Sequence, residues 1–211
     1  ISGITIGTLP EAIGDGGGFL AKYDTNGVPL WIRQPAGYEG IGDVSVDASG
    51  HVYTVGVTPD PQTNDLLKYD SSGTSLWAQE FAGFAASTMD GVGNVYTVGG
   101  IGPNLGNVAL NKHDSSGTLL WSRQFGSSDH EGWLDVTTDS LGNVYISGAT
   151  YGDLGGSNAG DRDAFVAKYD GSGALQWIEQ FGTGETDIAH GVSADERGNI
   201  FVAGTTRGHL W

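Results

Sequence analysis

The chain has 211 residues, and its composition and charge already exclude several classes of protein. Glycine accounts for 37 residues, yet aromatic residues make up 10% and hydrophobic residues 38% of the chain, so it is neither collagen-like nor disordered. The 25 acidic against 9 basic residues give a net charge of −16, which argues against binding nucleic acid or inserting into membranes. No apolar run approaches the ~20 residues that span a bilayer, and there is no cysteine.

Two short phrases alternate along the chain. The first begins with Tyr or His followed by Asp, has Gly three residues after the Asp and ends on Trp, at residues 23–31, 69–77, 113–121 and 169–177. The second begins with Asp, also has Gly three residues later, and ends on Val or Ile and an aromatic residue, at residues 47–53, 90–96, 139–145 and 195–201. The four tryptophans of the first phrase are 46, 44 and 56 residues apart, which is the period of a repeat protein.

Each phrase predicts a β-hairpin, because the Asp accepts backbone hydrogen bonds at the start of a turn and the Gly adopts the left-handed conformation that closes it. The flanking segments, such as 165–169 and 199–204, are short and alternate in polarity, and no helical periodicity lies between them. The sequence therefore predicts an all-β fold, a β-propeller of four-stranded antiparallel meander blades with four repeats plus one extra N-terminal strand.

We expect a single domain over residues 1–211. Within it, residues 1–15 are predicted to be the outer strand and linker of a preceding blade, and the four blades to span residues 16–61, 62–106, 107–161 and 162–211.

The segments 163–170, 177–182 and 195–204 resemble the bacterial SBBP repeat, the seven-bladed β-propeller repeat family. The resemblance covers nearly the whole chain and is closest from about Gly106 to Gly208. It implies a secreted or cell-surface bacterial protein built from several blades. It carries no family-wide catalytic residues, so we expect that the chain is not an enzyme.

The two ends of the chain repeat motifs found inside it. Residues 1–3 match residues 146–148, and residues 206–210 match the start of a connection between repeats. We therefore expect a segment of a longer repeat array. An isolated segment would expose an apolar face and an unpaired strand edge, so it should self-associate or be poorly soluble.

The Asp of each predicted turn is expected to be structural, because turn chemistry already explains it; these are Asp24, Asp47, Asp70, Asp90, Asp114, Asp139, Asp170 and Asp195. Binding residues are expected on the opposite loops, where three repeats place a carboxylate eight residues before the second phrase. Either these carboxylates form an acidic rim that binds a ligand, or they are solvated loop residues. The candidates are Tyr38, Glu39, Asp129, His130, Glu131, Trp133, Glu185, Asp187 and His190.

The long connection between the third and fourth repeats offers hard oxygen ligands on a glycine-rich loop, which suits Ca²⁺. The candidate ligands are Asp153, Asn158, Asp161 and Asp163, although an acidic linker explains them equally well. No other cofactor is expected.

These observations favour a non-enzymatic interaction or structural module whose partner is a second copy or another surface protein. The alternative is a lectin-like propeller that binds a glycan, because an aromatic ring beside carboxylates is typical of sugar sites. A glycan-active enzyme is a further alternative, in which Glu131 and Asp187 would act as paired carboxylates.

Overall fold

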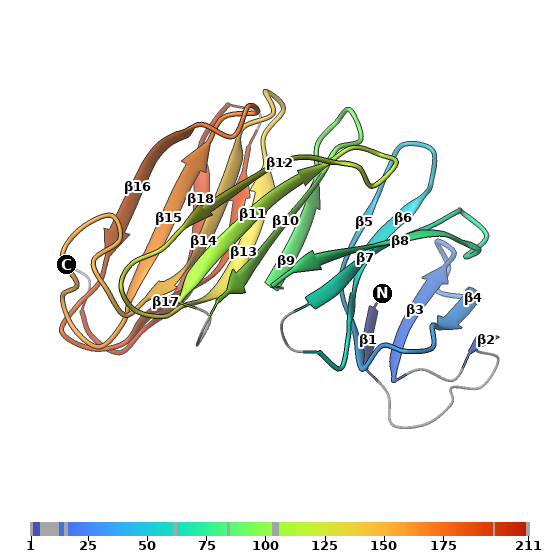
Figure 1. Ribbon diagram of the computed structural model, residues 1–211, viewed down its shortest axis with the longest axis horizontal. Helices are drawn as coiled ribbons and strands as arrows, with labels where there is room; N and C mark the ends of the chain where they lie inside the picture. Colours follow the sequence, from blue (N-terminus) through green and yellow to red (C-terminus); the bar gives the residue numbers. More distant parts are fainter. Residues whose placement is uncertain are drawn as a thin grey trace. The chain divides into compact units, whose positions relative to one another are not determined.

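The computed structural model describes residues 2–4, 13–14, 17–60, 63–83, 85–102, 106–195 and 197–209, and these residues form strands and turns without any helix (Figure 1). It follows that nothing in the described part of the chain is a helix long and apolar enough to cross a bilayer. The chain divides into two compact units, residues 1–84 and residues 85–211. The all-β prediction is confirmed.

Unit 1 contains two four-stranded sheets. The strands of the first, in spatial order, are β1 (Ser2–Ile4), β3 (Gly18–Tyr23), β4 (Pro29–Gln34) and β2 (Ile13–Gly14), and those of the second are β5 (Gly40–Val46), β6 (Val52–Val57), β7 (Thr63–Tyr69) and β8 (Ser75–Ala82). All neighbours are antiparallel except β2 and β4, which pair in parallel over two residues. The buried core between these two sheets is formed by Leu20, Ile41, Val52, Leu67 and Tyr69.

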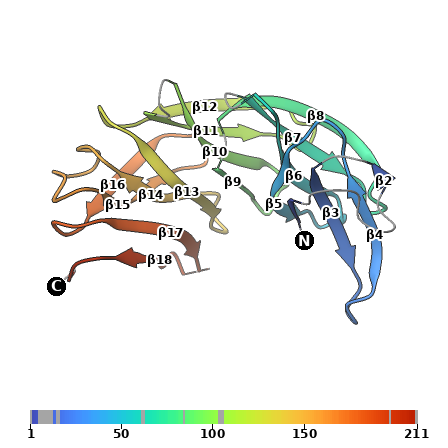
Figure 2. The same cartoon turned by 90° about the horizontal axis from the view of Figure 1, so that it is seen from below.

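Unit 2 contains two complete antiparallel sheets and one short sheet. The complete sheets are β9 (Ala85–Met89), β10 (Val95–Ile101), β11 (Asn107–His113) and β12 (Leu119–Phe125), then β13 (Glu131–Thr138), β14 (Val144–Thr150), β15 (Asp163–Tyr169) and β16 (Leu175–Phe181). The short sheet has only β17 (Asp187–Ala194) and β18 (Ile200–Thr206), and β18 runs along the border of the unit (Figure 2). A cluster that includes Tyr96, Leu110, Val136, Ile146 and Phe165 forms the core.

Every predicted hairpin turn forms. In each, the glycine has a positive φ, between 78° and 90°, which a residue with a Cβ adopts only at a cost. The Asp side chain accepts hydrogen bonds from the amides two and four residues ahead, as Asp170 does from Ser172 and Ala174 at 2.9 and 3.0 Å. The chemistry of a single turn is local, so the sequence was enough to predict it.

The predicted blade boundaries are wrong, because the sheets begin one hairpin later in the repeat than we expected. The predicted blade 16–61 combines β3 and β4 with β5 and β6, but these belong to two different sheets. The same holds for the predicted blades 62–106, 107–161 and 162–211, and β1, predicted to belong to a preceding blade, pairs with β3. Because both phrases form hairpins, the phrases alone do not show which hairpin comes first in a sheet. That order depends on which strands of successive hairpins pair, as β6 does with β7. Residues 1, 5–12 and 15 of the predicted outer strand and linker, and residue 16 of the first predicted blade, lie outside the described residues.

Candidate functional site

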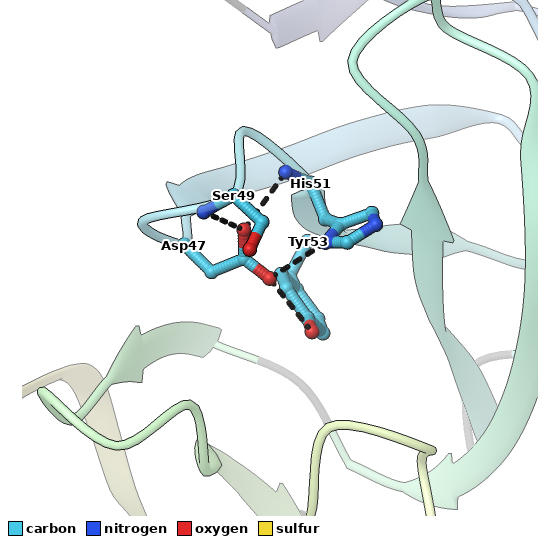
Figure 3. A network of polar contacts seen from close by, with 4 residues as sticks. All are labelled: Asp47, Ser49, His51 and Tyr53. Atoms are coloured by element: carbon cyan, nitrogen blue, oxygen red, sulfur yellow. Dashed lines mark hydrogen bonds and ion pairs between the residues drawn. The ribbon is translucent and has the colours of Figure 1, made fainter.

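The turn carboxylates are occupied by local hydrogen bonds, as Asp47 illustrates (Figure 3). Its Oδ1 accepts from the amides of Ser49 and His51 at 2.9 Å, and its Oδ2 lies 2.9 Å from His51 Nδ1 and 3.4 Å from the Tyr53 hydroxyl. Desolvation raises the pKa of Asp47, but the hydrogen bonds from His51 and Ser49 outweigh it and hold that pKa below its usual value. These contacts agree with the structural role predicted for the turn aspartates.

On the connecting loops of unit 2, four side chains gather into a group that we call the Trp133 cluster: His130, Trp133, Tyr151 and Arg162. The Arg162 guanidinium lies 4.6 Å from the ring centroid of Trp133 and 4.7 Å from that of Tyr151. The His130 ring meets both aromatic rings edge to face, with centroids 6.4 and 5.9 Å away. The cluster joins a bulge in β13 to the two ends of the loop between β14 and β15.

Arg162 differs from the other stacked arginines of the chain. Arg33 and Arg123 each lie over a tryptophan and donate from Nε, at 2.7 Å, to a backbone carbonyl of the next sheet's turn. Arg162 Nε is buried and has no hydrogen-bond partner, and the same is true of His130 Nδ1. The Trp133 cluster therefore holds two buried polar atoms that the described residues leave unsatisfied, which is unusual in a purely structural contact.

Trp133 has a strained backbone and an exposed ring. Its φ of 54° is the only positive φ at a non-glycine position in the described part of the chain, and 42% of the residue is exposed. Backbone strain of this kind concentrates at functional sites. The bulge between Gly132 and Asp135 produces this conformation and turns the ring toward the loops.

Sequence reasoning found His130 and Trp133 but missed Tyr151 and Arg162. A signal was present, because these two residues flank the loop of 152–161 that lengthens the last repeat. It was not decisive, since an aromatic residue and an arginine eleven residues apart in the sequence do not indicate that they stack on a common neighbour.

The predicted acidic rim does not form. Glu39 is exposed, but Glu131 and Asp187 are each only 1% exposed. Glu131 Oε1 accepts from the amide and hydroxyl of Ser127 and from the Thr150 hydroxyl, and these bonds turn its side chain inward.

The remaining predicted binding residues are dispersed. The Tyr38 hydroxyl donates to Asp65 at 2.7 Å, and desolvation followed by the Asp65 carboxylate raises its pKa well above the usual value. His190 Nε2 lies 3.1 Å from the Thr205 hydroxyl. Asp129 and Glu185 are exposed loop residues beside the buried carboxylates.

The predicted four-residue calcium loop is not assembled either. Asp153 accepts from the Asn158 amide at 2.7 Å, Asn158 accepts from the Gly160 amide, and Asp161 accepts from the Thr186 hydroxyl at 2.7 Å. The described residues contain no group of three or more His, Cys, Asp or Glu side chains placed to hold a metal ion. Of the four predicted ligands, only Asp163 is buried.

Comparisons with known proteins support the fold. Residues 176–210 match the family model of the SBBP β-propeller repeat, which confirms the predicted resemblance over that segment. No curated protein matches the sequence. A crystal structure of a protein of unknown function from Bacteroides caccae is similar over 96% of this chain and 64% of its own, with 12% identity and a TM-score of 0.54.

Variants of an apocarotenoid oxygenase from Synechocystis are similar over 87–90% of this chain and 55–56% of theirs, with 10–11% identity and TM-scores of 0.43–0.44. An enzyme is therefore among the similar structures, which corrects the expectation that the chain is not an enzyme. Similarity at this level transfers no activity and no residue. The chain spans less than two thirds of the length of these solved structures.

Proposed function

We propose that the chain is an interaction module made of propeller-type blades, and that it takes up strands from a second copy of itself. The observation that carries the proposal is the exposed strand β18, which pairs with β17 alone among the described residues and has six of its seven residues exposed. The four-stranded sheets and the SBBP match support blades as the repeating unit. A secreted or cell-surface location stays a prediction from the family resemblance.

The outer strand of this short sheet is open to a partner. β14 lies between two strands, and all seven of its residues are buried. β18 holds the same place in its repeat, but in the described part of the chain it pairs only with β17, and six of its seven residues are exposed. Phe201 is 61% exposed, whereas its counterpart Tyr145 is fully buried. Such an edge, with unpaired backbone groups and exposed apolar side chains, is a template for another strand.

The strand that fits this edge is β3 of a second copy. Residues 18–24 and 164–170 differ only at their first and third positions, and the latter segment supplies the strand that pairs with β14. β3 therefore has the side chains that a strand in the β18 sheet would need.

In unit 1, the position beside β3 is held by a strand of only three residues. Gly3 of β1 lies opposite Phe19, just as Gly148 of β14 lies opposite Phe165. Gly204 occupies the corresponding place in β18. β18 of one copy would take the place of β1 on β3 of another, in the same register.

The proposed assembly would also cover an aromatic side chain of unit 1 that is exposed in the single chain. Tyr23, at the end of β3, is 42% exposed, while its counterpart Tyr169 is 3% exposed and packs against Phe125 of the preceding sheet with ring centroids 5.8 Å apart. In the assembly, Phe181 of the second copy would stand against Tyr23 as Phe125 stands against Tyr169.

Sedimentation equilibrium of the wild-type chain and of Ala203→Lys tests the proposal. Ala203 is exposed, so the free chain tolerates lysine, but Ser147 at the same place in β14 is fully buried, so lysine would block the added strand. We expect concentration-dependent association of the wild-type chain and its loss in the variant. Leu141→Lys, at a turn residue that is 85% exposed, is the matched control and should associate like the wild type. A wild-type chain that stays monomeric, or an Ala203→Lys chain that associates equally, contradicts the proposal.

A second candidate function is glycan binding at the Trp133 cluster, which the exposed ring and the unsatisfied atoms of His130 and Arg162 favour. Trp133→Gly removes the stacking ring while suiting the positive φ, so the variant should fold as the wild type does but lose glycan binding on an array. Leu141→Ala is the control and should bind normally. Binding that survives in Trp133→Gly, or no binding of any glycan by the wild type, removes this candidate.

A further inference from the structure

Two buried carboxylates take no part in the ring contacts of the Trp133 cluster, although both lie next to Arg162: Asp163 follows it in the chain, and the Asp187 amide donates to its carbonyl oxygen at 2.8 Å. Asp163 begins β15 and Asp187 begins β17, and each is 1% exposed. Asp163 Oδ2 accepts from the Ala159 amide at 2.9 Å and from Gln180 Nε2 at 3.1 Å, and Asp187 Oδ2 accepts from the amide and hydroxyl of Thr183 at 2.6 and 2.9 Å. The other oxygen of each carboxylate, Oδ1, is buried and has no hydrogen-bond partner.

The two side chains converge on one glycine. A Cβ atom at Gly182 would collide with Asp163 Oδ1 and would stand 3.1 Å from Asp187 Oδ2. Both carboxylates therefore border the same backbone position, at the loop end between β16 and β17. Glycine is required there because these carboxylates take the space of its side chain.

No basic side chain neutralises this pair. The structure gives neither carboxylate an ion pair among the described residues, and Arg162, next to Asp163 in the chain, is held instead between the rings of Trp133 and Tyr151. Hydrogen bonds satisfy one oxygen of each carboxylate, and a bound cation would satisfy the other.

The preceding repeat contains the same arrangement with one charge fewer. A Cβ at Gly126 would stand 2.8 Å from Asn107 Oδ1 and 2.9 Å from Glu131 Oε2, and Glu131 Oε2 is again buried and unpartnered. Asn107 begins β11 as Asp163 begins β15, and Glu131 begins β13 as Asp187 begins β17. The fold thus provides the same pocket twice, once with an amide and a carboxylate and once with two carboxylates.

We propose that Asp163 and Asp187 bind a divalent cation, and that Ca²⁺ is the ion that suits them. Ca²⁺ takes six to eight oxygen ligands from carboxylates, backbone carbonyls and water in flexible geometry. Since the described residues hold no group of three acidic or imidazole side chains, backbone carbonyl and water oxygens complete the coordination. Only Asp163 is shared with the calcium loop expected from the sequence. The proposal does not depend on association through β18.

Calorimetric titration of the EGTA-treated chain with CaCl₂, together with thermal unfolding in Ca²⁺ and in EGTA, tests the proposal. The wild-type chain should bind one Ca²⁺ and unfold at a higher temperature in Ca²⁺ than in EGTA. Asp163→Asn reproduces the pocket of Asn107 and should lose both effects. In EGTA this variant should unfold at the same temperature as the wild type or higher, because the repulsion between two buried carboxylates is gone. A residue with only a structural role would instead destabilise the chain in both conditions.

The reciprocal change strengthens the test. Asn107→Asp should create a second two-carboxylate pocket beside Glu131, so the stoichiometry should rise from one Ca²⁺ to two. Asp153→Asn, in the exposed part of the loop, is the matched control and should bind Ca²⁺ as the wild type does. The proposal is overturned if the wild-type chain shows neither binding heat nor a shift in unfolding temperature with Ca²⁺, or if Asp163→Asn responds to Ca²⁺ as the wild type does.

Discussion

Asp139 shows how a single turn carboxylate holds both a hairpin and the core beneath it. Its Oδ1 accepts from the amides of Leu141 and Asn143 at 2.9 Å, and its Oδ2 accepts from Asn143 Nδ2 at 2.7 Å and from the buried Tyr145 hydroxyl at 3.0 Å. Asp114, at the first phrase of its repeat, uses only Oδ1 for its turn contacts. Equivalent turn residues therefore differ in how much they stabilise the fold.

We predict that Asp139→Asn lowers the free energy of unfolding by about 1–3 kcal/mol, because an amide cannot accept from both Asn143 and Tyr145 with its second atom. Desolvation raises the pKa of Asp139, but hydrogen bonds from Asn143 and Tyr145 outweigh it and the pKa lies below its usual value. A pKa that is lower in the folded chain stabilises the fold above the unfolded pKa, about 3.9, and this contribution is lost as pH falls through the folded pKa.

Urea unfolding of Asp139→Asn at several pH values checks both statements. The difference from the wild type should be full at neutral pH and should shrink as the pH falls below about 4. Asp114→Asn is the control and should have a smaller effect, since its Oδ1 contacts survive in the amide. An equal loss in both variants, or a difference that does not change with pH, would refute this interpretation of Asp139.

At the scale of the strand, the same sequence phrase has different surroundings in different repeats. Phe165 in β15 is fully buried and packs edge to face on Phe125, with ring centroids 6.1 Å apart. Phe19, at the same position in β3, is only half-buried. β18 shows the same kind of difference, because it exposes residues whose counterparts in β14 are buried.

We predict that Phe165→Ala lowers the free energy of unfolding by about 3–5 kcal/mol, because it leaves a cavity in a close-packed core. Phe19→Ala should cost clearly less in dilute solution, because Phe19 is only half-buried whereas Phe165 is fully buried. Chemical denaturation of both variants at low protein concentration makes the comparison. Equal losses in the free energy of unfolding would mean that Phe19 is packed as well as Phe165, and would contradict the interpretation that β3 is less well covered than β15.

Prediction from the sequence succeeded where the chemistry is local. The Asp and Gly of each turn specify a hairpin within five residues, so all eight turns were predicted correctly. The order of hairpins in a sheet was not, because it depends on pairing between β6 and β7 and on the equivalent pairs. The burial of Glu131 depends on Ser127 and Thr150, and the stacking of Arg162 depends on a bulge, and neither follows from spacing along the chain.

At the scale of the whole molecule, two strands from different repeats have matching pairing partners. β18 has no neighbour beyond β17 among the described residues, and residues 18–24, which contain β3, differ from residues 164–170 only at the first and third positions. The two strands match each other as β14 matches β15. We therefore propose that β18 of one copy pairs with β3 of a second copy.

Hydrogen exchange of the β18 backbone amides, measured as a function of protein concentration, tests this claim most directly. The amides that face the open edge, among residues 201–205, should exchange rapidly in dilute solution and become protected as the concentration rises, and Ala203→Lys should abolish that protection. The fully paired β14 should be protected at every concentration. Rapid exchange of the open-edge amides of β18 at all concentrations would contradict the account, because the edge would then take up no strand.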